Sequence, residues 1–600
     1  MISSKKGSIA SIHGSLISIK GIEKQVKLHN IVKVEKHNIL GEVLQIYPDH
    51  VIAQCFENTE KLRIHEDVLD LGSPLSMELA PGLISSIFDG IQRPLKVIYE
   101  QKGGFLERGI EVEPLSRTKK WLFKPTRKVG DKVEEGDIIG IVKETPLIEH
   151  KIMIPFSYSG IITQIVQEGE YTILEDIYTI KRENDETSFP MLQTWPVTKP
   201  RPFKRKNVPN EPLITGIRVI DLLFPIARGG CVAVPGGFGT GKTVIQQSLA
   251  KWSNADIIIL VGCGERGNEM ADVLKDFLKI IDPKTNRPLI ERVVLIANTS
   301  NMPVSAREIS IFSGVTIAEY YRDMGYNVAV LADSTSRWAE ALREISGLME
   351  EMPAEEGYPA YLSSKLSGFY ERSGVVQLVG SEEKYGSITL VGSVSPPSGD
   401  FSEPVTATTK RFVQAFWALD AKLAYSKHYP AINWLDSYSK YTDYVNDWWL
   451  ERNFNWNEID VDWMECRTKI DEILAKEANL ENISQLIGEE NLPEEQQLSL
   501  FLANLIKKGF LIQNAFDEID RFTDPRKLLG MIKIILLFFK QASELLQSGV
   551  LLEDIKNLDV INSILRIGIT IPNESFDKIV EIKDTLIKQM EDLKLSYRGL

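Results

Sequence analysis

An eight-residue stretch at 236–243 constrains the fold of this chain more than any other part of its sequence, because it follows the pattern G-x-x-x-x-G-K-[ST]. The apolar run at 231–234 before it predicts a buried strand, and apolar residues at 244, 245, 249 and 252 follow it at helical spacing. A glycine loop between a strand and a helix directs backbone N–H groups and the positive end of the helix dipole toward one point. The sequence therefore predicts a phosphate-binding loop formed by Gly236, Gly237, Phe238, Gly239, Thr240, Gly241, Lys242 and Thr243.

Two side chains of this loop add chemistry to that of its backbone. Lys242 is expected to reach the outer phosphates of a nucleoside triphosphate, and the hydroxyl of Thr243 to bind magnesium. The glycines allow the backbone to wrap around a phosphate chain without side-chain collisions. The expected ligands are therefore ATP or ADP together with Mg²⁺.

Bulk properties exclude several classes of protein. A chain of 600 residues is too long for one core and indicates about three or four domains. The net charge of −14 argues against a nucleic-acid surface, and the proline-interrupted basic run at 199–206 is typical of a solvated linker. The four cysteines form no C-x-x-C pair, which excludes the usual zinc spacings and favours a reducing cytoplasm. No apolar stretch approaches the length of a membrane span, so any connection to a membrane is expected to pass through partners.

The fold class predicted from the order of these patterns is multidomain α/β. Short strand patterns predict an N-terminal β-barrel over residues 1–75, and helical periodicity predicts a C-terminal helical domain over 439–600. Residues 76–110 and 190–438 are expected to form the nucleotide-binding domain, since its apolar runs alternate with helical stretches as in a parallel sheet. A β-rich insert is predicted at 111–189.

The insert resembles the flattened barrel of biotinyl and lipoyl carrier domains, which suggests two functions. A carrier needs a modified lysine at an exposed hairpin tip, whereas the tip here reads Glu-Thr-Pro-Leu at 144–147. The nearest lysine, Lys151, lies in the next strand pattern. A structural insert is therefore expected.

Two acidic residues follow apolar strand patterns of the nucleotide-binding domain. Asp333 ends the run 328–332, which is where a carboxylate that holds the magnesium shell is expected. Glu265 follows the run 257–261 through a Gly-Cys-Gly turn and is a candidate for the base that activates a water, with Arg266 as a phosphate contact. The residues alone leave a second interpretation open, in which Glu265 and Arg266 form a surface ion pair.

Three longer segments resemble one known family. The segments 262–270 and 332–344 are similar to those of the A subunits of V-type and archaeal-type rotary ATPases, and 430–439 (PAINWLDSYS) resembles the signature of the wider rotary superfamily. The insert looks like the bulge domain that distinguishes A subunits. The resemblance covers essentially the whole chain and implies a RecA-like nucleotide-binding domain in a catalytic subunit that interconverts ATP with ADP and phosphate, coupled to proton or sodium transport.

Family resemblance also implies roles for single residues. Glu265 would be the general base, Lys242 and Arg266 phosphate contacts, and Arg337 a second basic residue near the γ-phosphate. Tyr429 would pack against adenine and Phe516 would close the other side, although core packing is the alternative for both rings. The chain departs from the family at Gly237, where proline is usual, and at Thr240, where eukaryotic members carry a cysteine.

The implied partners are a B subunit in an alternating hexamer with three copies of each, a central shaft, peripheral stalks and a membrane rotor. The implied location is peripheral, on the cytoplasmic side of a membrane. Two rival functions are a non-catalytic nucleotide-binding subunit of a similar ring and a hexameric translocase of the Rho-like or secretion type. The presence of Lys242 and Glu265 argues against the first, and the insert, the acidic charge and the signature at 430–439 argue against the second.

Overall fold

The structure, a computed structural model, describes residues 5–103, 109–182, 185–267, 275, 278–282, 285–452 and 461–598. It divides into two compact units. The first unit consists of Met1–Val208, Ala255–Ser395 and Phe401–Phe412, and the second of Pro209–Asn254, Pro396–Asp400 and Val413–Leu600. This division differs from the four domains expected from the sequence, whose boundaries stay a prediction.

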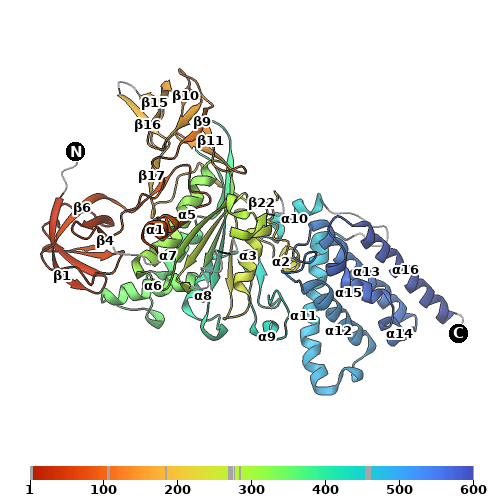
Figure 1. The fold of residues 1–600 in the computed structure, drawn as a ribbon. Helices are drawn as coiled ribbons and strands as arrows, with labels where there is room; N and C mark the ends of the chain where they lie inside the picture. The colour runs from red at the N-terminus through yellow and green to blue at the C-terminus, as the bar shows by residue number, and fades with distance from the viewer. Residues whose placement is uncertain are drawn as a thin grey trace. The chain divides into compact units, whose positions relative to one another are not determined.

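The first unit begins with a closed antiparallel β-barrel, drawn in red in Figure 1. The strand order around it is β1-β2-β5-β4-β3-β6. Apolar side chains that alternate along these strands fill the barrel, among them Ile9, Ile19, Val32 and Val43. The strands are β1 (Lys5–His13), β2 (Leu16–Lys20), β3 (Asn30–Val34), β4 (Ile39–Ile46), β5 (Val51–Cys55) and β6 (Asp67–Pro74).

The insert consists of two four-stranded sheets, with orders β12-β11-β9-β14 and β10-β13-β15-β16. Each sheet contributes buried apolar side chains, such as Phe123 and Val142 from one and Ile162 and Ile180 from the other. The strands are β9 (Trp121–Pro125), β10 (Lys132–Val133), β11 (Ile138–Lys143), β12 (Glu149–Met153), β13 (Gly160–Ile165), β14 (Gly169–Tyr171), β15 (Asp176–Arg182) and β16 (Asp185–Pro190).

The hairpin tip between β11 and β12 buries Glu144 and Thr145 and leaves Pro146 exposed. The Glu144 carboxylate accepts hydrogen bonds from the backbone N–H groups of Gly82 (2.7 Å) and Ile84 (2.9 Å). It also lies 2.7 Å from Nδ1 of His150 and accepts a bond of 2.9 Å from the hydroxyl of Tyr321, a residue of α5 (Val304–Asp323). Burial raises the pKa of Glu144, but the neighbouring His150 and these hydrogen bonds outweigh it and hold that pKa below its usual value. The tip is thus an anchor of the insert.

A parallel sheet forms the centre of the first unit, with strand order β26-β24-β20-β23-β8. Helices α5 and α6 pack against several of its strands. The strands are β8 (Ile87–Phe88), β20 (Ile257–Cys263), β23 (Val293–Asn298), β24 (Asn327–Asp333) and β26 (Tyr385–Val394), with β25 (Gly374–Gln377) and β18 (Arg205–Asn207) added antiparallel. The helices of this unit include α1 (Leu95–Lys102), α6 (Thr335–Leu348), α7 (Leu362–Tyr370) and α8 (Pro404–Phe412), and two short pairs are β7 (Ser76–Leu79) with β17 (Gln193–Pro196) and β21 (Ile281–Asp282) with β22 (Arg287–Pro288).

The second unit combines a short sheet with a helical domain. Strand β19 (Cys231–Pro235) pairs parallel with β27 (Ala415–Phe416), which pairs antiparallel with β28 (Tyr438–Ser439). Side chains of Asp462 and Asp524 cap the first turns of α11 and α13, which explains where these two helices begin. The helices are α2 (Arg218–Leu223), α3 (Lys242–Trp252), α9 (Ala421–Tyr425), α10 (Thr442–Leu450), α11 (Trp463–Ile487), α12 (Glu494–Ile506), the π-helix η5 (Lys507–Leu511), α13 (Pro525–Gln547), α14 (Leu552–Lys556), α15 (Val560–Thr570) and α16 (Asp577–Arg598).

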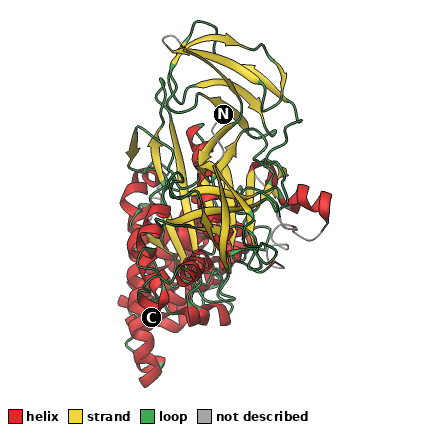
Figure 2. Cartoon of the chain, turned by 90° about the vertical axis from the view of Figure 1, so that its left-hand side faces the viewer, coloured by secondary structure: helices red, strands yellow, loops and turns green. Residues whose placement is uncertain are grey.

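The predicted fold class is confirmed: a β-barrel, an α/β nucleotide-binding part with an inserted β-rich domain, and a helical C-terminal part. Figure 2 draws all helices in red and all strands in yellow. Helix α13 is buried over most of its length. Within the described part of the chain, no helix has both the length and the apolar character needed to span a membrane.

We predict that the insert carries no biotin or lipoate. Lys151 donates a hydrogen bond of 2.7 Å from its Nζ to the carbonyl oxygen of Met324, and burial lowers its pKa, so it is neither exposed nor at a hairpin tip. Intact-mass measurement on protein purified from its native cell should give the mass of the unmodified chain. Peptide mapping that finds a cofactor mass on Lys151 would contradict the structural role of the insert.

Candidate nucleotide site

The predicted phosphate-binding loop lies between β19 and α3 in the second unit, in the strand-loop-helix order that the motif requires. All five residues of β19 are buried, and α3 begins at Lys242. Gly239 and Gly241 have φ angles of 79° and 93°, a conformation that side chains other than glycine rarely adopt. The backbone conformation of the loop therefore requires glycine at these two positions, whatever space a side chain would have.

Gly236 is required for a different reason, which is space. The segment after β27 runs alongside β19, and the N–H of Leu419 donates a bond of 2.8 Å to the carbonyl of Pro235. A Cβ atom on Gly236 would lie 2.7 Å from the Cβ of Leu419 and 2.6 Å from the Oγ1 of Thr240. The first glycine of the motif thus lets the loop turn directly above its neighbouring segment.

Polar side chains within the loop bind its carbonyl oxygens. Lys242 Nζ lies 2.5 Å from the carbonyl oxygen of Gly236 and 3.3 Å from that of Gly237, and the hydroxyl of Thr240 donates to the Gly237 carbonyl at 2.8 Å. The first turn of α3 contains no acidic residue, and no side chain of the described residues caps it. Its backbone N–H groups and the Lys242 ammonium therefore offer positive charge to an anion, which fits a phosphate chain.

The exposed residues of the loop include the predicted magnesium contact. Thr243 is exposed in the first turn of α3, so its side chain is accessible from solvent. Phe238 is 90% exposed at the top of the loop. A Cβ atom on Gly237 would meet no atom within 4 Å, so the missing proline at this position does not change the packing.

Both predicted adenine contacts belong to the same unit as the loop. A Cβ atom on Gly241 would lie 3.8 Å from ring atoms Cδ1 and Cε1 of Tyr429, so this ring lies beside the start of α3. The Tyr429 carbonyl accepts a hydrogen bond of 2.8 Å from the N–H of Gln513, three residues before Phe516. The exposed fractions, 41% for Tyr429 and 82% for Phe516, do not fit the core-packing alternative.

The remaining predicted residues lie in the first unit, at the carboxyl ends of two adjacent parallel strands. Asp333 is the last residue of β24 and pairs in register with Gly262 of β20. Glu265 is half-buried two residues after β20, and its carbonyl accepts a bond of 2.9 Å from the N–H of Ser300. Arg266 is exposed; residues 268–270 of the segment that resembles the family lie outside the described residues.

Arg337 packs beside the turn that carries Glu265. Its N–H donates to the hydroxyl of Ser334, which caps α6, at 3.4 Å. A Cβ atom on Gly264 would lie 2.6 Å from the Cβ of Arg337, so only glycine fits there. The guanidinium is paired with the carboxylate of Glu340 at 2.8 and 2.9 Å. The structure thus brings Arg337 next to the Gly264 turn, with its charge directed to Glu340.

The fold and these sites define a nucleoside-triphosphate-binding protein of the phosphate-loop class, because strand, glycine loop, helix start, lysine and threonine occur together in the geometry that phosphate binding requires. Comparison with known proteins gives the family. Profiles of the ATP synthase alpha/beta family match its nucleotide-binding domain at 216–439, its barrel-sandwich domain at 112–198 and its beta-barrel domain at 9–72, and the C-terminal domain of V and A type ATP synthase matches at 452–556.

Curated relatives match nearly the whole chain. The A subunit of the A-type ATP synthase from Methanopyrus kandleri is 53% identical, covering 99% of both chains. A V-type ATP synthase alpha chain from Clostridium botulinum is 47% identical, covering 98% of both chains. A solved structure of the assembled ATPase EscN from an enteropathogenic E. coli type III secretion system covers 88% of this chain with a TM-score of 0.62, but at 21% identity this likeness concerns the fold alone.

The chain belongs to the family of A-type ATP synthase A subunits and V-type ATP synthase alpha chains. It is therefore a catalytic subunit of a rotary ATPase, an enzyme that interconverts ATP with ADP and phosphate in a multisubunit complex coupled to ion transport. Its ligands are ATP or ADP with Mg²⁺. These findings confirm the predicted family, activity and cofactors.

Two residues at the site were not found from the sequence. Leu419 contacts the loop, but one leucine in an apolar run gives no signal of its own. Arg218 is 1% exposed and contacts the segment that leads to Phe516. The sequence does contain a pattern that could have identified Arg218, since Arg218 and Asp221 are the two charged residues of the otherwise apolar run 217–226. Charges in such a run indicate a buried polar network.

His428, next to Tyr429, is buried close to a positive charge. It is 8% exposed, and its ring centroid lies 5.7 Å from that of Trp434. The ammonium of Lys507 lies 5.0 Å from the centroid of the same Trp434 ring. Two causes lower the pKa of His428 to about 4: the larger is burial of the ring, and the smaller is the positive charge of Lys507. The imidazole is therefore neutral at physiological pH.

This shift predicts acid sensitivity of the second unit. Because the pKa in the folded chain is below that of an exposed histidine, the stability that His428 contributes is present above about pH 6.5 and is lost as the pH falls toward 4. We expect the unfolding free energy to decrease between pH 7.5 and pH 5 by on the order of 2 kcal/mol more in the wild type than in His428→Gln. Urea unfolding followed by tryptophan fluorescence measures both.

His13→Gln, at an exposed histidine, serves as the matched control and should keep the pH dependence of the wild type. Parallel pH profiles for the wild type and His428→Gln would contradict the assignment of the acid sensitivity to His428.

Proposed function

We propose that Glu265 is the general base of ATP hydrolysis and that Asp333 supports the magnesium shell. The observation that supports this is their position, because Asp333 ends β24 and Glu265 follows β20, two adjacent parallel strands. Ligands of open parallel sheets bind at the carboxyl ends of strands. A half-buried carboxylate there is suited to accept the proton of a water that attacks the γ-phosphate.

The loop residues would bind the phosphates in this proposal. Lys242 exchanges its bonds to the loop carbonyls of Gly236 and Gly237 for bonds to phosphate oxygens, so its charge is already held in the loop before ATP enters. Thr243 and Asp333 would hold the magnesium ion, which when bound neutralises charge on the phosphates. Arg266 and Arg337 would add positive charge near the γ-phosphate, and Arg337 must then leave Glu340.

Tyr429 and Phe516 would form the two walls of the adenine pocket. The support for this is their exposure and the link between their segments, since the Tyr429 carbonyl binds the N–H of Gln513. Aromatic faces are suited to stack on a purine, and each such contact contributes about 1–3 kcal/mol to binding.

We also propose the subunit composition and the location of the complex. The chain would alternate with B subunits in a ring of six, three of each, around a central shaft, with peripheral stalks and a membrane rotor, and it would lie on the cytoplasmic side of the membrane. The names of the relatives, which are A subunits of A-type and alpha chains of V-type ATP synthases, support a multisubunit complex of this kind. In such rings an arginine of the neighbouring subunit commonly completes the charge around the γ-phosphate.

The roles of base and binder predict different kinetic losses. Glu265→Gln keeps size and hydrogen-bonding capacity but accepts no proton, so ATP should still bind while turnover falls by at least about 100-fold. Lys242→Ala removes the charge that faces the phosphates and should lower both binding and turnover. Equilibrium binding of ATP and steady-state rates distinguish them. Equal losses of binding and turnover in Glu265→Gln would indicate a structural ion pair instead.

The ring predicts that the isolated chain is a poor ATPase. Without an arginine from a B subunit, less positive charge surrounds the γ-phosphate in the transition state. Loss of such an arginine commonly lowers kcat by a factor of about 1000 or more. We expect near-background hydrolysis and weak nucleotide binding for the purified chain, and activity after mixing with B. Rates of the isolated chain that match those of the assembled ring would refute the shared site.

A further inference from the structure

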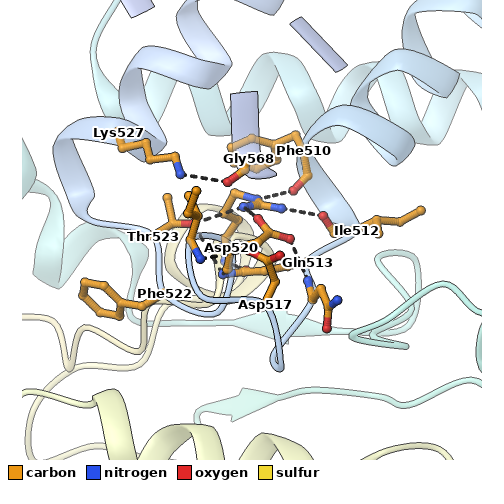
Figure 3. A network of polar contacts seen from close by, with 12 residues as sticks. Phe510, Ile512, Gln513, Asp517, Asp520, Phe522, Thr523, Lys527 and Gly568 are labelled. Carbon is orange, nitrogen blue, oxygen red and sulfur yellow. Dashed lines mark hydrogen bonds and ion pairs between the residues drawn. The ribbon is translucent and has the colours of Figure 1, made fainter. Parts of the chain in front are cut away.

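The loop between η5 and α13, residues 512–524, carries Phe516 and is tied to α2 by one buried arginine. Figure 3 shows the carbonyl oxygens of Phe510 and Ile512 and the side chains of Asp520 and Thr523 converging on one point. The side chain at this point is that of Arg218, the first residue of α2. The loop and the helix that precedes β19 thus share a single polar centre.

The guanidinium of Arg218 binds both ends of this loop. Nε donates to the carbonyl of Phe510 at 2.6 Å, and Nη2 donates to that of Ile512. Nη1 donates to Oδ1 of Asp520 at 2.5 Å and to the hydroxyl of Thr523 at 3.1 Å. One planar group therefore fixes the distance between the beginning of the loop and its end.

Gln513 extends this network to Tyr429. Its side-chain Oε1 accepts a bond of 2.8 Å from the backbone N–H of Arg218, and its Nε2 donates to the carbonyls of Gly216 and Asp520 at 2.8 Å each. The backbone N–H of the same residue donates to the Tyr429 carbonyl at 2.8 Å. Gln513 thus joins the Arg218 centre to the residue whose ring lies beside the phosphate loop.

The end of the loop is held against the helix that starts with Lys242. Phe522 stacks on Trp252, the last residue of α3, with ring centroids 5.2 Å apart. The N–H of Thr523 donates to the carbonyl of Gly216 at 3.0 Å, and a Cβ atom on Gly216 would lie 2.0 Å from the ring of Phe522. The loop is therefore fastened at both ends, with Phe516 exposed between them.

A lysine would not reproduce the Arg218 centre. Arg218 uses three nitrogen atoms in one plane for four acceptors that lie in different directions, and lysine has one nitrogen on a flexible stem. The site also has no spare room, because a Cβ atom on Gly568 would lie 2.8 Å from Asp520 and 3.2 Å from Nη1 of Arg218. The structure therefore specifies the shape of the side chain as well as its charge.

We propose that Arg218 is a positioning residue for adenine recognition: through Gln513 and the loop 512–524 it sets where Tyr429 and Phe516 stand, and it touches neither the phosphates nor the water. This inference rests on the proposed adenine role of those two rings. It goes beyond that role because it assigns base affinity to a buried charge that makes no contact with the base.

The proposal separates base affinity from phosphate affinity. Loss of the Arg218 centre frees the loop that carries Phe516 and that binds Tyr429 through Gln513. The phosphate loop, in contrast, keeps its glycines, its contact with Leu419 and Lys242. A ligand with phosphates and a base should therefore lose affinity, and a ligand with phosphates alone should keep it. Inorganic tripolyphosphate with Mg²⁺ is such a ligand.

The test uses the assembled rotary ATPase that contains the full chain. We expect Arg218→Lys to raise the KM for ATP by about tenfold, within the range of one lost ring contact. The inhibition constant of tripolyphosphate against ATP, and kcat at saturating ATP, should change less than about twofold. A rise in both constants by the same factor would show a general structural role and overturn the proposal, as would an unchanged KM.

Arg292→Lys is the matched control. Arg292 is also a buried arginine, 5% exposed, and pairs with Asp282 at 2.8 Å in the first unit. It should lower thermal stability as Arg218→Lys does, without a change in the ratio of the KM for ATP to the inhibition constant of tripolyphosphate. A change of that ratio in the control equal to that in Arg218→Lys would overturn the proposal.

A second variant covers the case in which Arg218→Lys fails to fold. The double substitution Arg218→Met with Asp520→Leu removes both charges of this ion pair, and replacements of buried ion pairs by apolar side chains often retain stability. It should show the same rise in the KM for ATP alone. A wild-type enzyme in which tripolyphosphate does not compete with ATP would refute the proposed role of the phosphate loop, a result distinct from any outcome in the variants.

Discussion

Burial of parallel strands decides where this protein can place charge. Every residue of β20 is buried, and β24 is buried from Val328 to Ala332, so carboxylates are excluded until the strands end. Because neighbouring parallel strands run in one direction, Glu265 and Asp333 emerge at the same edge of the sheet of the first unit. In the second unit β19 is equally buried, and its chain turns into the phosphate loop where burial ends. Apolar packing thus selects the polar edges on which the enzyme depends.

The parts that the sequence predicted well are those governed by local chemistry. Three patterns each determine the local backbone structure over a few residues. They are a glycine loop before a helix, an aspartate after five apolar residues, and the alternation of apolar and polar residues along a barrel strand. The position of Lys151 within β12 and the turn at 144–147 followed in the same way. The β-barrel, the α/β part, the insert and the helical part could therefore be predicted from the sequence, and so could the order of strand, loop and helix around the glycine motif.

Contacts between distant residues could not be predicted. Arg218 binds residues 292 to 305 positions further along the chain, and nothing in a single sequence tells which carboxylate a buried arginine meets. The burial of Glu144 is similar, since one polar residue at a hairpin tip reads as exposed until Gly82, Ile84 and Tyr321 are seen around it. The division into two compact units follows from packing between distant segments, which the order of sequence patterns does not reveal.

The anchored tip of the insert has a consequence for how such chains can be shortened or recombined. Tyr320 and Tyr321 of α5 are fully buried and bind His150 and Glu144, both from the insert. A chain without residues 111–189 would turn two aromatic hydroxyls and the adjoining surface of α5 toward water. The insert and helix α5 are therefore matched to each other. A family member without the insert must carry different residues on this helix, and moving the insert between homologues requires moving the residues of α5 with it.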